Sequence, residues 1–373
     1  MSTSPQTVPQ TVANPLIETP LAAQLGASAA VLTPYQGALT PNVFSALDQE
    51  LASLATHAGI YDLGYKAYLK ITGADRIRWL NGMVSNTIQA LPDGRWNYSF
   101  LLNAQGRIQG DASVYRNPES LILQTDRSQI GRLSAHLDHF IIMDDVELQS
   151  LDASRTTIGI AGPSAPEILT AHGLPVPDDG AFTNAAFKGS EITLAHAYSP
   201  LVPRFELWLP IAALPDIWSA LQNAGATPCG VGAIEALRIF EATPLYGLDI
   251  QDRHLAQETA QTRALNFNKG CYLGQEIVER IRSRATVHRT LRQFSIENAP
   301  ASLPAGQTIE INAEGAERNP VGELTSVAHY SLPAFNGALA LGFIRTEAIE
   351  RRLPLAHSSG SVTVLDAPPS LHK

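Results

Sequence analysis

The chain has 373 residues, of which 45% are hydrophobic and 16% are charged, and its formal net charge is −9. This composition excludes a disordered or collagen-like chain, and the length predicts two or three domains. The acidic balance argues against strong direct binding of nucleic acid, because attraction to phosphates dominates that affinity.

The sequence also lacks the signals of membrane insertion and export. No stretch approaches the roughly eighteen consecutive apolar residues of a transmembrane helix, and no Lys or Arg precedes Lys66. We therefore expect a cytoplasmic protein without membrane partners. The two cysteines, Cys229 and Cys271, are too few for a disulfide framework or a cysteine-rich zinc site, so we predict no resident metal.

The predicted elements begin after a Pro-rich and nearly uncharged segment, residues 1–42. We expect this segment to be poorly ordered or to lie as a strap on the surface. Apolar residues at helical spacing then predict a helix over 43–57. The next elements are a strand at 68–71, a helix at 76–83, a hairpin with strands at 96–102 and 107–115, a strand at 121–124 and a helix at 128–139.

Two further blocks complete the chain after this first one, residues 43–139. The first block orders its helices and strands without strict alternation, which favours an α+β fold with antiparallel strand pairs. Residues 156–248 form a second block of short strands and helices. After residue 285 the pattern changes to short strands separated by turn residues, which is typical of a small β-barrel or sandwich. We therefore predict an α+β region over 43–284 and a C-terminal β domain over 285–373.

One segment combines a thiol with polar neighbours: Lys269-Gly270-Cys271-Tyr272-Leu273-Gly274-Gln275-Glu276. The apolar spacing from Cys271 to Ile281 predicts a helix that begins just after Gly270. Cys271 would then lie at a helix N-terminus beside Lys269, and both features favour the thiolate form. Gly270 would let a ligand approach the backbone.

The alternative for either cysteine is a buried and inert thiol, the common state of a free cysteine. We favour that interpretation for Cys229, but the polar neighbours of Cys271 argue against it there.

A run of arginines follows the segment, and it is either a solvated face paired with glutamates or a cradle for an anionic ligand. Its members are Arg280, Arg282, Arg284, Arg289 and Arg292.

The eight residues from Lys269 to Glu276, called the octapeptide below, resemble the K-G-C-[FY]-x-G-Q-E motif of the YgfZ family. These are folate-dependent proteins of iron–sulfur cluster assembly and repair, related to the glycine-cleavage T-protein, an aminomethyltransferase. Further segments of the chain resemble the same family, and together they cover roughly residues 43–345. They are 57–63, 101–107 with Asp111, 161–165 and 237–249.

The resemblance implies a T-protein-like (GcvT-like) fold, in which two α+β subdomains surround a folate pocket and a C-terminal β-barrel closes it. It implies tetrahydrofolate or a derivative as cofactor, with Cys271 and Asp111 as the reactive residues. The residues it nominates for cofactor binding are Lys269, Gly270, Tyr272, Gly274, Gln275, Glu276, Arg280, Asn103, Arg238, Glu241, Tyr246 and Asp249.

Two departures from the T-protein pattern concern acidic residues. T-proteins carry a carboxylate pair where this chain has Gly110 followed by Asp111, so one acid is left. The glutamate of the L-R-[IL]-E-A-G segment is displaced by one residue, to Glu241. On a helix this displacement turns a side chain by about 100°.

The leading hypothesis is therefore a tetrahydrofolate-binding accessory protein for iron–sulfur clusters, whose client enzymes include radical enzymes that modify tRNA. A single cysteine cannot hold a cluster alone, so any cluster would be transient and shared with a client or a second chain. The main alternative is a folate-dependent aminomethyltransferase or demethylase in which Asp111 acts as a base. A cysteine hydrolase or acyltransferase would need a histidine near Cys271, and His254 and His288 are the nearest in sequence.

Overall fold

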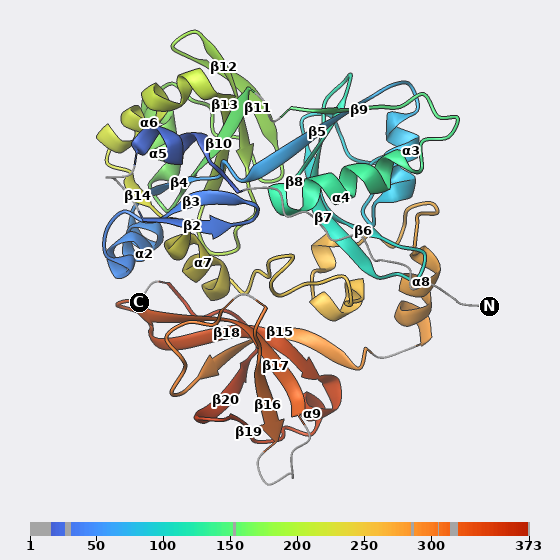
Figure 1. The fold of residues 1–373 in the computed structure, drawn as a ribbon, viewed down its shortest axis with the longest axis vertical. Coiled ribbons are helices and arrows are strands. Elements are labelled where there is room, and N and C mark those ends of the chain that lie inside the picture. Colours follow the sequence, from blue (N-terminus) through green and yellow to red (C-terminus); the bar gives the residue numbers. More distant parts are fainter. Residues whose placement is uncertain are drawn as a thin grey trace, which may run out of the picture.

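Two β-sheets stand side by side above a closed β-barrel in the computed structural model of this chain (Figure 1). The structure describes residues 16–26, 31–151, 154–284, 287–304, 306–313 and 320–371. Within these ranges, no helix has the length and apolar character needed to cross a membrane. The longest, α4, has 12 residues.

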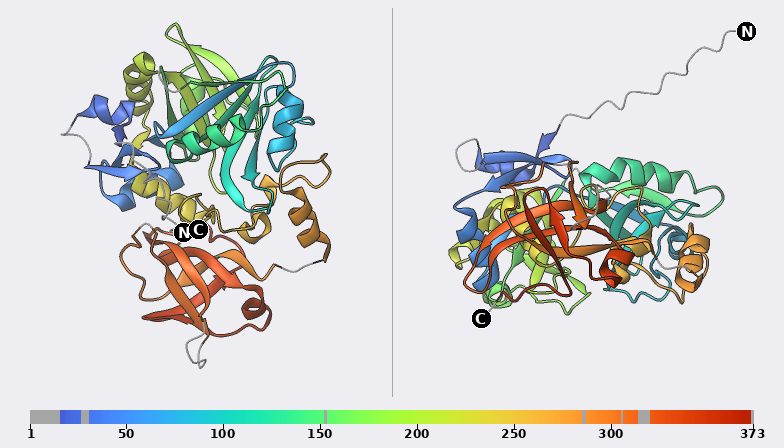
Figure 2. Two further views of the ribbon diagram at one scale, coloured as in Figure 1. Left: turned by 45° about the vertical axis from the view of Figure 1, so that its right-hand side comes forward. Right: turned by 90° about the horizontal axis from the view of Figure 1, so that it is seen from below.

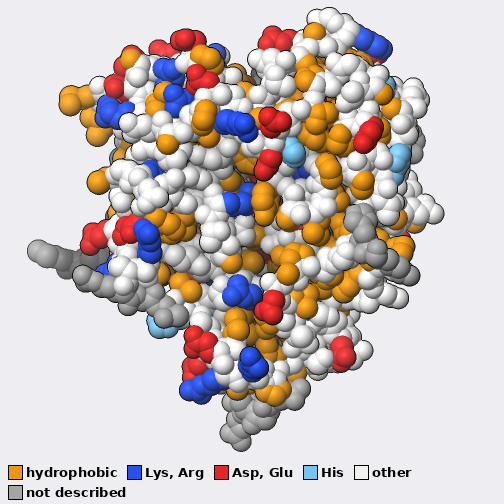
Figure 3. Space-filling view, turned by 180° about the vertical axis from the view of Figure 1, so that it is seen from behind, with side chains coloured by type: hydrophobic (Ala, Val, Ile, Leu, Met, Phe, Trp, Pro, Cys, Tyr) orange, Lys and Arg blue, Asp and Glu red, His pale blue; other side chains and the backbone are white. Residues whose placement is uncertain are grey.

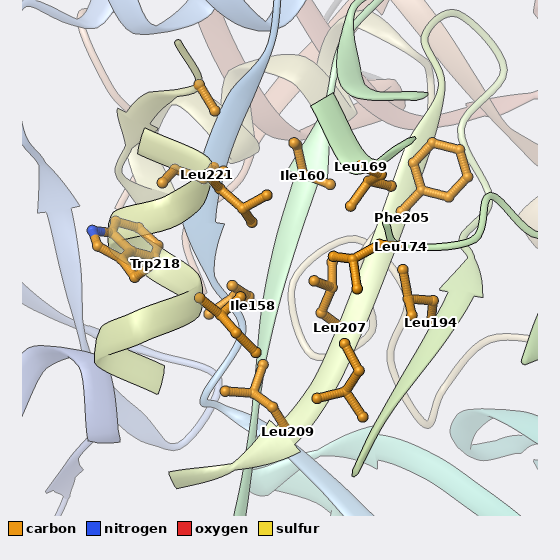
Figure 4. Close-up of a cluster of buried hydrophobic side chains, with 14 of the residues drawn as sticks. Ile158, Ile160, Leu169, Leu174, Leu194, Phe205, Leu207, Leu209, Trp218 and Leu221 are labelled. Carbon is orange, nitrogen blue, oxygen red and sulfur yellow. The ribbon is translucent and has the colours of Figure 1, made fainter. Parts of the chain in front are cut away.

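The first sheet has six strands, and its apolar side chains form the core shown in Figure 4. In spatial order they are β11 (Phe182–Phe187), β12 (Ser190–His196), β13 (Arg204–Pro210), β10 (Arg155–Ala161), β4 (Gly59–Asp62) and β14 (Thr227–Cys229). Helices α5 (Ala165–Ala171) and α6 (Leu214–Asn223) contribute Leu169, Trp218 and Leu221 to this core. Position 159 in β10 requires glycine, because a Cβ there would lie 2.2 Å from the ring of Tyr61.

The second sheet has five antiparallel strands. In spatial order they are β6 (Trp96–Leu102), β7 (Ile108–Arg116), β8 (Leu121–Asp126), β5 (Lys66–Thr72) and β9 (Glu147–Ser150). Helices α3 (Arg76–Met83) and α4 (Arg127–Asp138) pack on it through Leu80 and Leu133. The predicted hairpin is present as β6 and β7, in which Phe100 lies opposite Asp111.

The described part of the N-terminal segment lies along the outside of the molecule (blue in Figure 2). It forms β1 (Ile17–Glu18), α1 (Pro20–Leu25), β2 (Val31–Tyr35) and β3 (Ala38–Val43). Thr19 is buried, and its hydroxyl donates to the carboxylate of Asp62 at the end of β4. We call the described residues 16–26 and 31–43 the strap below, and residues 1–15 and 27–30 of the predicted tail lie outside the described ranges.

The C-terminal strands close into the predicted barrel. In spatial order they are β15 (Arg289–Ile296), β18 (Asn336–Arg345), β17 (Pro320–Ser331), β16 (Ile309–Ala313), β19 (Leu355–His357) and β20 (Gly360–Leu365). The short helix α9 (Thr346–Glu350) follows β18. The predicted boundary at residue 285 falls on a residue outside the described ranges.

Helices and single turns join these parts. Helices α2 (Leu47–Thr56) and α7 (Val231–Phe240) pack on each other, and α7 also contacts β17 of the barrel. The short 3-10 turns are η1 (Ile211–Ala213), η2 (Ala256–Thr259) and η3 (Thr262–Ala264). Helix α8 (Gln275–Arg284) lies beside the tip of the β6–β7 hairpin, where a Cβ on Gly106 would approach Ile277 to 2.8 Å (Figure 1).

Candidate functional site

A cavity lies between the two sheets, and its lining is rich in aromatic and charged side chains. The aromatic members are Tyr35, Tyr61, Tyr65, Trp96, Tyr98, Tyr115 and Tyr198. The charged members are Lys66, Asp111, Asp126, Arg204, Glu206, Arg238 and Arg263. Aromatic walls with a few placed polar groups are typical of a small-molecule site, so we take this cavity as the candidate site.

Asp111 on β7 is held in a fixed orientation inside the cavity. The Tyr98 hydroxyl donates to Oδ2 at 2.6 Å, and Gln129 Nε2 on α4 donates to Oδ1 at 2.8 Å. Burial, followed by the negative charge of Asp126, raises the pKa of Asp111, and these two hydrogen bonds oppose the rise only in part. A carboxyl with a raised pKa can exchange a proton closer to neutral pH, as acid–base chemistry requires.

Position 110 cannot supply the second acid of the T-protein pair. A Cβ on Gly110 would lie 2.7 Å from Leu133 Cδ2 and 2.9 Å from Gln129 Oε1, both on α4. Successive residues of a strand point to opposite faces, so position 110 faces α4 while Asp111 faces the cavity. The site therefore has one acid at this place, as the sequence indicates.

A second group of charges lies deeper between the sheets. Lys66 Nζ pairs with Asp126 at 2.7 Å. Glu206 accepts a hydrogen bond from Gln124 Nε2 at 2.5 Å and a longer one from the Trp208 indole at 3.4 Å. Each of these carboxylates has a donor beside it, so the charges at this end are compensated within the protein.

Arg238 and Asp249, two of the predicted cofactor ligands, pair with each other. Arg238 Nη1 lies 2.7 Å from Asp249, and its Nη2 lies 2.6 Å from Glu235. Asp249 is fully buried and accepts hydroxyl hydrogen bonds from Thr325 and Ser326 on β17. Arg238 thus lines the cavity, whereas Asp249 connects α7 to the barrel.

The other residues nominated by the resemblance lie outside the cavity lining. Tyr246 is buried beside Ile108, and its hydroxyl accepts from Arg132 Nη2 at 2.6 Å. Asn103 Oδ1 accepts from the backbone N–H groups of Gln105 and Arg107, which closes the β6–β7 turn. Glu241 is buried at the end of α7. The Ser199 hydroxyl donates to its Oε1, and its Oε2 has no partner among the described residues.

Lys269 of the octapeptide caps the end of a helix. Its Nζ donates to the backbone carbonyls of Asn81, Val84 and Asn86 at 2.5, 2.6 and 2.7 Å, at the C-terminal end of α3. Burial lowers the pKa of Lys269 to about 7. Three carbonyl acceptors at the negative end of a helix favour the charged ammonium and oppose that effect.

The following residues pack on the tip of the β6–β7 hairpin. Tyr272 is buried beside Phe100 and Leu102, and its N–H donates to Gln275 Oε1 at 3.2 Å. Gly274 has φ +82°, and a Cβ there would lie 2.6 Å from the carbonyl oxygen of Asn103. Glycine is therefore required at position 274 both by backbone conformation and by space.

The predicted position of Cys271 at a helix N-terminus is wrong. Helix α8 begins at Gln275, because Gly274 adopts a left-handed conformation and the chain turns there. Cys271 lies in the preceding loop with its side chain exposed, and Gly270 and Glu276 are also exposed. The described cavity lining includes no residue of the octapeptide.

Two of the five arginines after the octapeptide are bound to neighbouring side chains, and within the described structure Arg292 donates only to the backbone carbonyl of Leu291. Arg282 lies over the ring of Phe267 and 3.6 Å from Glu279, while Arg289 pairs with Glu258 at 3.2 Å. These contacts favour the solvated-face interpretation for both residues. Arg280 is exposed on α8, and the side chain of Arg284 is outside the described structure. On the face in Figure 3, acidic and basic side chains are interspersed.

A cysteine hydrolase needs a histidine hydrogen-bonded to Cys271, and in the described part of the chain neither His254 nor His288 makes that bond. His254 is fully buried and stacks on Phe343, with ring centroids 4.1 Å apart. Its Nδ1 accepts from the backbone N–H of Gln251, and burial together with nearby arginines lowers its pKa to about 3. The ring is therefore an interior packing group.

Several cavity residues escaped the sequence analysis, and a local signal existed for one of them. Tyr98 is the diagonal neighbour of Asp111 once the hairpin pairs Phe100 with Asp111, so the register alone could have identified it. Tyr198 and Arg263 come from separate parts of the chain, and only the tertiary structure brings them to the same cavity. Gln129 is outside the lining, and the tertiary structure places its side chain on Asp111.

Comparison with known proteins matches this chain to one family model and to proteins named as aminomethyltransferases. Residues 21–269 match the family model described as the GCVT N-terminal domain. An aminomethyltransferase of Exiguobacterium sibiricum is 26% identical over 307 residues, covering 80% of this chain and 85% of the relative. One from Synechocystis sp. is 25% identical over 350 residues, covering 89% and 90%.

A solved structure confirms the predicted fold class. The glycine cleavage system aminomethyltransferase T of Bartonella henselae superposes with a TM-score of 0.80 at 19% sequence identity. The match covers 94% of this chain and 96% of that one. The fold is therefore the mixed α+β arrangement with a C-terminal six-stranded barrel that the resemblance implied.

Proposed function

The chain belongs to the GCVT N-terminal domain family, and from this membership and the cavity around Asp111 we propose that it binds tetrahydrofolate and transfers a one-carbon group. Asp111, half-buried at the cavity wall and oriented by Tyr98 and Gln129, is the observation that carries the proposal. The relatives named above as aminomethyltransferases support transfer of an aminomethyl group, or the related demethylation, as the reaction class.

The cavity suits the chemistry of a reduced folate. Such a molecule has a flat pterin ring, a benzoyl ring and a glutamate tail, which require aromatic surfaces, polar partners and a cation. Tyr61 and Arg204 line the cavity, yet Tyr61 Oη, Arg204 Nε and Arg204 Nη2 are buried without a partner among the described residues. Buried polar groups are costly unless they are hydrogen-bonded, so these atoms fit a polar ligand or an ordered water.

In this reaction Asp111 acts as the proton-exchanging group of the chain. Bound tetrahydrofolate supplies the nitrogen atoms that carry the one-carbon unit. Tyr98 and Gln129 each donate to one carboxylate oxygen of Asp111 and so fix its orientation, while the aromatic walls exclude water. A positioned general acid or base typically contributes a factor of about 100 to 10,000 in rate.

The proposal is tested by titrating the full chain with tetrahydrofolate and its formyl derivative. Tryptophan fluorescence reports binding, because Trp96 lines the cavity, and Trp96→Phe identifies its share of the signal. Formation of 5,10-methylenetetrahydrofolate from an aminomethyl donor is then measured. We expect saturable binding, and we expect Asp111→Asn to lower the rate about 100-fold while changing affinity much less. Absence of folate binding would overturn the proposal, and an unchanged rate in Asp111→Asn would remove Asp111 from the chemistry.

A second candidate function is the predicted accessory role in iron–sulfur cluster assembly or repair, and the exposed thiol of Cys271 favours it. The packed contacts of Lys269 and Tyr272 hold the loop that presents the exposed Cys271 thiol. One thiolate can contribute a single ligand, so a cluster handled here would be shared with a client enzyme or a second chain.

The expected cytoplasmic location of the protein stays a prediction.

This second function has its own test. Activity of an iron–sulfur client, such as a radical enzyme that modifies tRNA, is compared under oxidative stress in cells carrying the wild type or Cys271→Ser. Loss of client activity with folate binding intact would support the accessory role. Client activity equal to that of the wild type would contradict it.

A further inference from the structure

Arg263 lies at the cavity between two tyrosines, and its backbone is tied to the second sheet. It belongs to η3, and its carbonyl oxygen accepts from Asn86 Nδ2 at 2.8 Å. The next carbonyl, of Ala264, accepts from the Ser85 hydroxyl at 2.6 Å. The base of the Arg263 side chain is therefore fixed relative to β6.

Two aromatic rings hold the guanidinium group. Its central carbon is 4.2 Å from the ring centroid of Tyr98 and 3.8 Å from that of Tyr198. A guanidinium packed against aromatic faces keeps its N–H groups at the edge available to a planar anion. The Nε of Arg263 donates to Gln261 Oε1 at 3.2 Å. This acceptor is an uncharged amide, so it does not balance the positive charge of the guanidinium.

The charge of Arg263 is not balanced by a carboxylate, unlike that of two other cations in the cavity lining. Lys66 pairs with Asp126 and Arg238 pairs with both Glu235 and Asp249. Among the described residues, no carboxylate lies within ion-pair distance of Arg263. Arg204 also lacks an ion pair, but its Nε and Nη2 are buried in the interior.

The separation of Arg263 from Asp111 suits an extended ligand that contacts Asp111 at one end and Arg263 at the other. Tyr198 is 40% exposed, which places this group of three side chains at the cavity mouth. The ring of Tyr98 contacts Arg263, and its hydroxyl donates to Asp111, so one phenol ring separates the cation from the acid. In a folate, one benzoyl group likewise separates the reactive nitrogens from the glutamate carboxylates.

We propose that Arg263, clamped by Tyr98 and Tyr198, binds a carboxylate of the ligand's glutamate tail and so sets the preference for folates over their tail-less analogues. The inference rests on the proposed folate function and assigns the tail end of that site. A bidentate contact between a guanidinium and a carboxylate combines charge with geometry, so it discriminates strongly between ligands with and without the carboxylate.

The test compares tetrahydrofolate with tetrahydropteroate, which lacks the glutamate, by calorimetry on the full chain. For the wild type we expect tetrahydrofolate to bind about 10-fold to 100-fold more tightly. In Arg263→Gln the two ligands should bind alike, with the affinity for tetrahydropteroate close to that of the wild type. Arg351→Gln, which alters an exposed arginine on the barrel side, is the matched control and should keep the full preference.

Two outcomes separate the assignment of Arg263 from the folate function, and a second variant tests the clamp. If Arg263→Gln keeps the full preference for tetrahydrofolate, the assignment of Arg263 is overturned while the folate function stands. If the wild type binds neither ligand, both are overturned. Tyr198→Leu gives a second route, because it loosens the clamp without removing the charge, and it should lower the preference by a smaller factor.

Discussion

The Asp111 cavity and the octapeptide loop are held by different kinds of contact. The cavity collects side chains from many elements, and side-chain hydrogen bonds or ion pairs hold Lys66, Asp111 and Arg238 in its lining. In the octapeptide, Lys269 binds backbone carbonyls, Gly274 makes room for a backbone oxygen, and Cys271 is exposed. The segment with the clearest sequence motif is thus largely a packing element with one outward thiol, whereas the candidate site has almost no local signature.

This difference has a physical consequence for mutations. Removing one partner of a buried charge network leaves the other charge uncompensated in a medium of low dielectric, which is costly. Removing an exposed side chain leaves solvent in its place, and stability changes little. The cavity and the loop should therefore respond very differently to substitution.

The largest effect is expected at Asp249, which holds the cavity wall to the barrel. Asp249→Ala leaves part of the Arg238 charge, two hydroxyls and the Leu245 N–H without their acceptor, and should lower the unfolding free energy by about 3–5 kcal/mol. Urea unfolding measures this change. The control is Glu347→Ala, which breaks an exposed pair with Arg351 and should have almost no effect. A loss at Asp249 as small as that of the control would contradict the comparison.

A pH effect is expected at Asp62, where the strap docks on the first sheet. Burial raises the pKa of Asp62 to about 6, although the hydrogen bonds from Thr19 and Gly64 oppose the rise. The folded protein then binds more protons than the unfolded chain, so stability should fall as pH increases from about 4 to about 6, by about 2–3 kcal/mol.

The Asp62 effect is measured by urea unfolding at several pH values in the wild type and in Asp62→Asn. The variant should lack this component of the pH dependence, because it has no carboxyl to titrate. Identical pH profiles for the two proteins would show that Asp62 does not cause the change.

A moderate loss is expected at Lys269 in the loop. Lys269→Met leaves three carbonyls at the end of α3 without their donor, and the unfolding free energy should fall by about 2 kcal/mol. The matched control is Lys188→Met, an exposed lysine 3.3 Å from Asp216, which should change little. Equal effects in the two variants would mean that Lys269 does not cap the helix.

The smallest effect on stability is expected at Cys271. Cys271→Ser should change the unfolding free energy by less than about 0.5 kcal/mol, because the side chain is exposed. In native protein a thiol reagent should label Cys271 and spare Cys229, which is buried beside Gly59 and Leu54. Labelling of Cys229 at the same rate, or protection of Cys271, would contradict the placement of the two thiols.

Much of the fold was accessible from the sequence, because its signals are local. Alternation of apolar and polar residues predicted the β6–β7 hairpin, and apolar residues at helical spacing predicted α2 and α4. The change to short strands separated by turn residues near residue 285 predicted the C-terminal β domain. The error at Cys271 was also local in origin. Apolar spacing continued through residues 271–281, but the left-handed Gly274 ends the loop and delays the helix to Gln275.

The sequence by itself determined the fold class, since its patterns are local, and the resemblance of its segments to the T-protein family pointed to Asp111 and to the octapeptide. Only the tertiary structure decided which side chains meet. It placed Gln129 and Arg263 beside the Asp111–Tyr98 pair, directed Asp249 toward the barrel, and left Cys271 exposed outside the described cavity lining. The octapeptide motif remains a loop with an outward thiol, and the cavity is set by contacts between residues far apart in the chain, which spacing alone does not encode.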